Sequence, residues 1–287
     1  MRLLAVLLAL LLAAPAAAQT PEERQRLDWT VQRGRLLFEI DRAAWVTTDD
    51  FRDRLTEADQ RLIRGWTVER DGAGFSVVYF SAGEGNARRA IYRGRVENRR
   101  VVSRETFRPG AGPELTPMQR RIADAYGLLS QANIRVCARG TPNLAVIPPE
   151  SLDAPMDVYV LTPQTQEGIF PFGGHSRVTF SAAGALLSQR AFTNSCLNLS
   201  TRPPSDLSAS EQLAGLVVTH LLDPIPTEVH VFMAIWTELP VTVSTAEPHR
   251  IWEVTGDRIE LMATPPNLPE DLIPPSPAPR TPATAGD

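Results

Sequence analysis

Hydrophobic positions follow a helical period in the first part of the chain. Thr20 can cap a helix that has Pro21 at its first position. Apolar residues then recur at spacings of about three and four, as in a helix with one buried face, at Leu27, Val31, Leu36, Leu37, Ile40 and Ala44. Gly34 weakens this helix because glycine is a poor helix former. Residues 47–63 are expected to form a connection and a shorter helix, capped by Thr48, Asp49 or Asp50.

Strand-like runs replace the helical period after residue 65. Aromatic and β-branched runs alternate with short turns of Gly, Asp and Asn, and they cover residues 66–69, 75–80, 90–96 and 101–107. This alternation predicts an antiparallel meander. Thr116 and Pro117 repeat the cap-and-proline start, which predicts a helix to about Gln131.

The second half of the chain predicts more strands and one helix. Five strand-like runs cover residues 134–137, 143–147, 157–161, 177–180 and 186–192. Ser208 can cap a helix, with Glu211 at the capping-box distance and an apolar face at Leu213, Leu216, Val217 and Leu221. The last strands are expected at residues 229–235, 241–243, 250–254 and 258–262. Together these elements predict an α+β fold of antiparallel meander sheets with a few packed helices.

The 287 residues are enough for two domains, and we expect two mixed α+β units at residues 19–132 and 133–263. Residues 1–18 hold one Arg, an apolar run and small residues before a cleavage site after Ala18, as in a signal peptide. A retained membrane anchor is the alternative, although the run is shorter than the ~20 residues of a spanning helix. No transmembrane segment is expected in the mature chain. The proline-rich residues 264–287 are expected to be a disordered tail.

Lysine is absent, so all 29 basic residues are arginine, against 33 acidic residues. The lack of lysine excludes Schiff bases, phosphate-loop lysines and Ser-Lys dyads. The mild net charge of −4 argues against general nucleic-acid binding. The sequence also lacks the GxSxG, HExxH and GxxxxGK[ST] patterns and any Cys-rich zinc spacing. No cofactor and no metal site are therefore expected.

Two cysteines, Cys137 and Cys196, are expected to form a disulfide, because an exported chain reaches an oxidising compartment. Closing a loop of this length stabilises the fold by on the order of 4 kcal/mol. A reactive thiol is the alternative, but the sequence has no CxxC motif. The expected location is the periplasm or the medium.

Arginines are concentrated in a predicted hairpin at residues 88–108, which contains eight of them and only two acids. Arg93 and Arg95 fall on one face of a strand, and Arg104 lies on the next strand. Such a surface can bind phosphate or carboxylate groups of the envelope, or an acidic partner protein. The alternative is a solvated sheet face on which arginine replaces lysine.

A pocket is the second candidate, with Asp157, His175 and Trp236 as its residues. His175 follows Gly173 and Gly174, which allow a sharp turn or close approach of a ligand. Convergence of two histidines among His175, His220 and His230 with Asp157 or Asp223 would form a zinc site or a general base. Trp236 and Trp252 can line a groove that stacks on sugar rings. Structural roles are the alternative for the histidines, and core packing for the tryptophans.

Two further blocks are RGRLLFEIDRAAWVTTDD at residues 33–50 and YVLTPQTQEGIFPFGGHSRVTF at residues 159–180. They resemble uncharacterised exported proteins of alphaproteobacteria. The resemblance implies an envelope location and no catalytic residues. The leading hypothesis is a non-enzymatic envelope protein that binds a partner or an anionic surface through the arginine hairpin. The alternative is a periplasmic hydrolase or metal-dependent enzyme with its site near His175.

Overall fold

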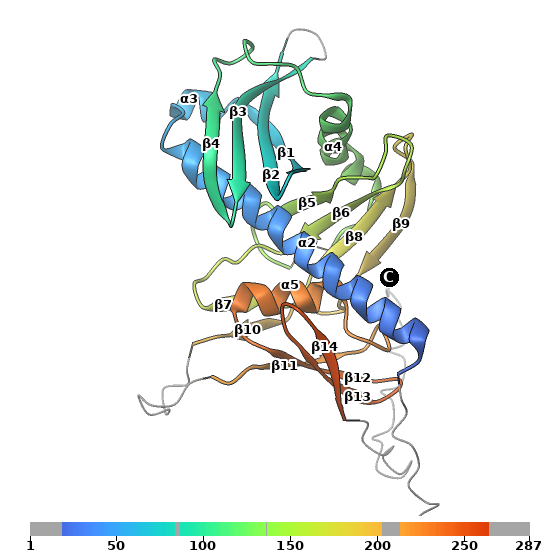
Figure 1. Ribbon diagram of the computed structural model, residues 1–287. Helices are drawn as coiled ribbons and strands as arrows, with labels where there is room; N and C mark the ends of the chain where they lie inside the picture. The colour runs from blue at the N-terminus through green and yellow to red at the C-terminus, as the bar shows by residue number, and fades with distance from the viewer. Residues whose placement is uncertain (1–18, 84–86, 136, 203–212, 264–287) are drawn as a thin grey trace, which may run out of the picture.

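The computed structural model describes residues 19–83, 87–135, 137–202 and 213–263 (Figure 1). The expected signal peptide, the expected tail and the proposed cap Ser208 lie outside these ranges. Within them, a long N-terminal helix runs past three four-stranded sheets, and a two-stranded sheet completes the fold (Figure 1). The predicted α+β class is confirmed.

The long helix, α2 (Pro21–Arg52), is continuous and extends further than the sequence predicts. The Thr20 hydroxyl accepts a hydrogen bond from a first-turn amide at 3.1 Å, which confirms the predicted start. The connection expected from residue 47 begins only after Arg52, and Thr56 caps the shorter helix instead of Thr48, Asp49 or Asp50. Thr47 and Thr48 donate their hydroxyls to carbonyls one turn back, so they lie inside the helix. The shorter helix is α3 (Glu57–Gln60).

The first sheet is the predicted meander, with strand order β1-β2-β3-β4 and antiparallel pairing throughout. Its strands are β1 (Ile63–Asp71), β2 (Gly74–Ala82), β3 (Arg88–Glu97) and β4 (Arg100–Thr106). The helix α4 (Pro117–Leu128) begins at the predicted cap, because the Thr116 hydroxyl accepts a hydrogen bond from the Gln119 amide at 3.1 Å. A short 3-10 helix, η2 (Leu129–Gln131), follows.

The second sheet has the antiparallel order β5-β6-β8-β9. Its strands are β5 (Asn143–Ile147), β6 (Met156–Leu161), β8 (Ser176–Phe180) and β9 (Leu186–Ala191). Two short strands that the sequence does not predict, β7 (Ile169–Pro171) and β10 (Asn198–Ser200), pair with each other. The strand expected at 134–137 is absent at the residues of that range that the structure describes.

The third sheet has the order β11-β12-β13-β14 and overturns two predictions. Its strands are β11 (Leu216–His220), β12 (Val241–Thr245), β13 (Arg250–Val254) and β14 (Ile259–Ala263). The expected helix at Leu216 and Val217 is strand β11, and the expected strand 229–235 is helix α5 (Glu228–Thr237). β11 and β12 are parallel, and a parallel pair needs a crossover, which α5 provides.

The largest hydrophobic cluster joins these layers. It includes Leu37 of α2, Tyr79 of β2, Tyr159 of β6, Phe232 of α5 and Trp252 of β13, so it draws on both units expected from the sequence. The unit boundary at residue 132 stays a prediction. No helix in the described ranges combines the length and the apolar character needed to cross a membrane.

Candidate functional site

A pocket of about 440 Å³ lies where α2, β1, α5 and two loops of the second sheet meet. Trp45 comes from α2, Trp66 from β1 and Trp236 from α5, and we call this site the tryptophan pocket. Asn143, at the start of β5, and Gln164, after β6, add side-chain amides to its lining. The pocket thus combines three aromatic rings from distant parts of the sequence with neutral polar groups and two charged side chains, Asp41 and Arg52.

Two of the tryptophans are held firmly by other aromatic rings. The Trp66 ring centroid lies 5.5 Å from that of Tyr126, whose hydroxyl donates to the Trp66 carbonyl at 2.8 Å. Trp236 packs edge-on against Phe170 and Phe232, at 5.3 and 5.5 Å. These contacts fix the ring orientations before any ligand arrives.

Trp45 differs, because 49 % of this residue is exposed although it lines a pocket. The guanidinium carbon of Arg42 lies 4.4 Å from its ring centroid, a cation–π contact. An exposed indole at a pocket wall offers apolar area that only a ligand or partner would cover.

Asp41 supplies the one carboxyl group of the pocket lining. Among the described residues it makes no side-chain hydrogen bond and no ion pair. Burial raises the pKa of Asp41 to about 7, and the nearby charge of Arg42 offsets only part of that effect. The group can therefore donate or accept a proton near neutral pH, and it can hydrogen-bond a ligand hydroxyl in either state.

The pocket contains one of the three pocket residues that the sequence suggests. Trp236 lines it, whereas Asp157 and His175 do not. Asp157 accepts a hydrogen bond from the Thr179 hydroxyl at 2.7 Å and forms an ion pair with Arg33. The three predicted residues therefore do not form one common site.

His175 is fully buried and both ring nitrogens are occupied. Nε2 donates to the Pro171 carbonyl at 2.8 Å, and Nδ1 accepts from the Thr162 amide at 3.2 Å. Burial lowers the pKa of His175 to about 4, so the ring is neutral at physiological pH. This environment leaves no nitrogen for a metal or a substrate.

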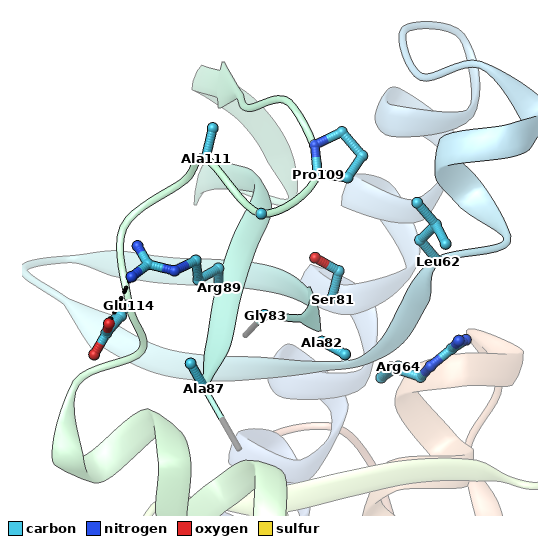
Figure 2. Close-up of a pocket in the computed structure, with 11 residues that line it drawn as sticks. Leu62, Arg64, Ser81, Ala82, Gly83, Ala87, Arg89, Pro109, Ala111 and Glu114 are labelled. Carbon is cyan, nitrogen blue, oxygen red and sulfur yellow. Dashed lines mark hydrogen bonds and ion pairs between the residues drawn. The ribbon is translucent and has the colours of Figure 1, made fainter. Parts of the chain in front are cut away.

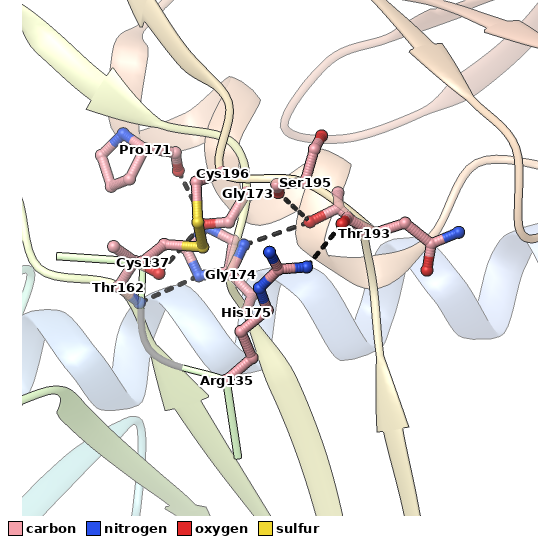
Figure 3. Close-up of a disulfide and its surroundings, with 11 residues drawn as sticks. Arg135, Cys137, Thr162, Pro171, Gly173, Gly174, His175, Thr193, Ser195 and Cys196 are labelled. Atoms are coloured by element: carbon pink, nitrogen blue, oxygen red, sulfur yellow. Dashed lines mark hydrogen bonds between the residues drawn. A yellow bond between two sulfur atoms is a disulfide. The ribbon is translucent and has the colours of Figure 1, made fainter. Parts of the chain in front are cut away.

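The adjacent disulfide explains the two glycines (Figure 3). Cys137 and Cys196 are bonded, as predicted. A Cβ on Gly174 would lie 2.5 Å from the Cys137 sulfur, and one on Gly173 would lie 2.3 Å from the Ser195 carbonyl oxygen. Because they have no side chain, the two glycines allow the backbone to pass close to the disulfide, which is a structural role.

The arginine candidates are paired with acids. Arg93 lies 3.5 Å from Glu105, and Arg104 lies 3.3 Å from Asp50. Arg95 contacts two carboxylates, Asp71 at 3.1 Å and Glu97 at 2.6 Å. These ion pairs offset the positive charge that the hairpin sequence suggests, so its binding role stays a prediction.

Two histidines do converge. His220 and His230 have ring centroids 4.8 Å apart, and His220 Nε2 donates to Asp223 at 2.8 Å. His230 Nδ1 instead accepts from the Thr227 amide at 3.0 Å. Across the described ranges, no three His, Cys, Asp or Glu side chains are arranged to hold a metal ion.

A larger pocket, about 940 Å³, lies at the edge of the first sheet (Figure 2). The buried Ser81 hydroxyl has no hydrogen-bond partner among the described residues. An ion pair of 2.7 Å between Arg89 and Glu114 crosses one side. The described lining has no aromatic ring, and it borders residues 84–86, which lie outside the described ranges. The tryptophan pocket is therefore the better candidate despite its smaller volume.

Sequence reasoning missed Asp41, Trp45 and Trp66 as site residues. One local signal existed, because α2 carries a stripe at helical spacing that lines the pocket, formed by Asp41, Trp45, Thr48 and Arg52. Trp66 and the amides left no comparable trace, because they reach the pocket only through long-range packing.

Comparison of the chain with family models, with curated proteins and with solved structures found no match.

Proposed function

We propose that the protein is an exported envelope protein that binds a carbohydrate in the tryptophan pocket. The observation that carries this proposal is the convergence of Trp45, Trp66 and Trp236 around a pocket whose polar groups are amides, hydroxyls, one carboxyl and one guanidinium. Indole rings pack against the flat apolar faces of sugar rings, and amides bond to sugar hydroxyls. The signal-peptide pattern of the first 18 residues supports export.

The size and charge of the pocket favour a neutral ligand. Its volume of about 440 Å³ falls within the range of small-molecule sites, ~300–1,000 Å³. Asn143 and Gln164 make no side-chain hydrogen bonds within the described part of the chain, so their donors and acceptors are available. The lining has one acidic side chain, Asp41, and one basic side chain, Arg52, so its charges balance when Asp41 is ionised and neither sign of ligand charge is favoured.

Binding is favoured over glycoside hydrolysis. Most glycosidases use two carboxyl groups on opposite sides of the bond that they cleave. The described lining of the tryptophan pocket supplies one, Asp41. A single carboxyl group with a pKa near 7 suits a hydrogen bond to a sugar hydroxyl.

Calorimetric titration with soluble oligosaccharides tests the proposal. The panel contains β-1,4-linked oligomers of N-acetylglucosamine and of glucose. We expect wild-type protein to bind at least one of them. Trp45→Ala should weaken binding by about tenfold or more, since covering a large apolar side chain contributes roughly 1.5–3 kcal/mol. Trp45 is half exposed, so its removal leaves the core intact.

Trp29→Ala is the matched control, because Trp29 is on the same helix, is 48 % exposed and lies outside the tryptophan pocket. It should bind like wild type. Equal losses in the two variants, or no binding of any oligosaccharide by the wild type, would rule out a carbohydrate site here.

A further inference from the structure

A separate pocket of about 190 Å³ lies beside the N-terminal half of α2. Three arginines line it: Arg26 from α2, Arg177 from β8 and Arg190 from β9. The rest of its wall includes Trp29 of α2 and the loop of residues 223–227 between β11 and α5. We call this site the arginine pocket, and it shares no lining residue with the tryptophan pocket.

Arg177 and Arg190 stand directly opposite each other on neighbouring strands. Like charges in this arrangement destabilise a sheet unless other groups compensate. Here each guanidinium forms an ion pair with one carboxylate from the far side of the pocket. Arg177 lies 3.0 Å from Glu228, and Arg190 lies 2.7 Å from Asp223.

Both carboxylates also accept hydrogen bonds from other groups. The Tyr159 hydroxyl donates to Glu228 at 2.9 Å, and His220 donates to Asp223 at 2.8 Å. Burial alone would raise the pKa of Asp223, but the His220 hydrogen bond and Arg190 outweigh burial and lower it. Asp223 therefore stays ionised and remains one of the two negative charges of the pocket.

With Arg177 and Arg190 each paired to a carboxylate, Arg26 provides the third positive charge of the lining. It makes no ion pair and no side-chain hydrogen bond with any residue that the structure describes. Nearby Arg33 is not available to the pocket in the same way, since it forms an ion pair with Asp157. The lining thus has three guanidinium groups against two carboxylates, an excess of one positive charge.

The shape of the pocket adds a second constraint. Its small volume accommodates an anionic head group rather than an entire extended ligand. Trp29 is 48 % exposed and lines the pocket, so it offers a flat apolar surface for the part of a ligand that extends outward. A phosphate carries close to two charges at pH 7, whereas a carboxylate carries one and matches the excess.

We propose that the arginine pocket binds a small organic carboxylate, with the carboxylate between Arg26, Arg177 and Arg190 and the apolar part on Trp29. The guanidinium fork matches a carboxylate in geometry and charge. Such a group occurs in free organic acids and at the C-terminus of a peptide, and the experiment distinguishes these sources.

The test is calorimetric titration of the full chain at low salt with four probes. These are benzoate, an N-acetylated dipeptide with a free C-terminus, the same dipeptide as its C-terminal amide, and inorganic phosphate. We expect benzoate or the free dipeptide to bind, and the amide to bind at least tenfold more weakly than the free dipeptide. Binding of benzoate alone assigns free acids as the source, and stronger binding of the free dipeptide assigns peptide termini.

Two variants separate the pocket from general surface charge. Arg26→Gln should weaken carboxylate binding about tenfold, and it should fold normally because Arg26 is exposed. Arg24→Gln removes an exposed arginine two positions earlier on α2 that does not line the pocket, and it should have little effect. Equal effects of the two variants, equal binding of acid and amide, tighter binding of phosphate, or no binding of either carboxylate would each overturn the proposal.

Discussion

Gly174 shows how a single residue can be fixed by its neighbours. Its φ of +81° is in the left-handed region, and an added Cβ would lie 2.5 Å from the Cys137 sulfur. We expect Gly174→Ala to lower the free energy of unfolding by roughly 3 kcal/mol or more, measured by urea denaturation. Gly110→Ala is the control, because Gly110 has a similar φ of +77° but open space around its Cβ position. If Gly110→Ala lowers the free energy of unfolding as much as Gly174→Ala does, then backbone strain, not the contact with the disulfide, explains why position 174 requires glycine.

Asp41, which lines the tryptophan pocket, also affects the free energy of unfolding. Its pKa is about 7 in the folded protein, whereas an aspartate in water has a pKa of 3.8, so folding disfavours the ionised form. The resulting loss of folding free energy is absent below pH 4 and grows as the pH rises toward 7. Above pH 7 it has its full value. Asp41→Asn should therefore be more stable than wild type at pH 8, by roughly 1–3 kcal/mol, and nearly equal at pH 4.

Urea denaturation at the two pH values measures this difference. Asp49→Asn, which removes an exposed carboxylate from the same helix, should show no comparable gain at pH 8. An Asp41→Asn variant that is no more stable than wild type at pH 8 would contradict the burial of this carboxyl. The gain in stability is expected to accompany weaker oligosaccharide binding, because functional sites often retain destabilising groups.

At the scale of elements, Gly34 sets how closely α2 and α5 approach. An added Cβ would lie 2.5 Å from the Val231 Cβ and 2.6 Å from the Glu228 carbonyl oxygen, so alanine would force the helices apart. We expect Gly34→Ala to destabilise the fold by about 2–3 kcal/mol, although alanine has a helix propensity ~1 kcal/mol better than glycine. Thermal and urea unfolding measure the effect.

Gly127→Ala in α4 is the matched control, because nothing lies within 4 Å of its added Cβ. It should stabilise the protein by roughly 0.5–1 kcal/mol through helix propensity alone. If both variants gained stability, the close contact between α2 and α5 would not limit the packing.

The elements that the sequence predicts correctly are those specified by local chemistry. Thr20 and Thr116 start helices through caps that act within one turn, and the first meander follows from its short turns. The sequence predicts a helix at β11 and a strand at α5, and both predictions are wrong for a different reason. The exposed Val217 and buried Leu216 and Val218 show that β11 has strand periodicity, but a helix pattern also fits these apolar positions. α5 is buried on nearly every side, so its run has no polar face to reveal a helical period.

At the scale of the whole molecule, sequence reasoning reached the fold class and the disulfide but only one residue of the tryptophan pocket. The pocket forms because α2, β1 and α5 meet, and those segments are far apart in the chain. The arginine pocket likewise depends on the register that places Arg177 opposite Arg190. Register and helix docking are long-range properties that hydrophobic periodicity does not specify.

The position of α2 also has a consequence for the order in which the protein can fold. This helix is at the N-terminal end of the described chain, yet it packs against α5, β5 and the first sheet. During synthesis α2 leaves the ribosome well before α5, so part of its apolar face stays uncovered until most of the chain has emerged. Contacts between such distant segments slow folding and prolong exposure of apolar surface to chaperones. Truncations that remove α5 should therefore expose the apolar face of α2 and cause aggregation, and they should not yield a smaller stable domain.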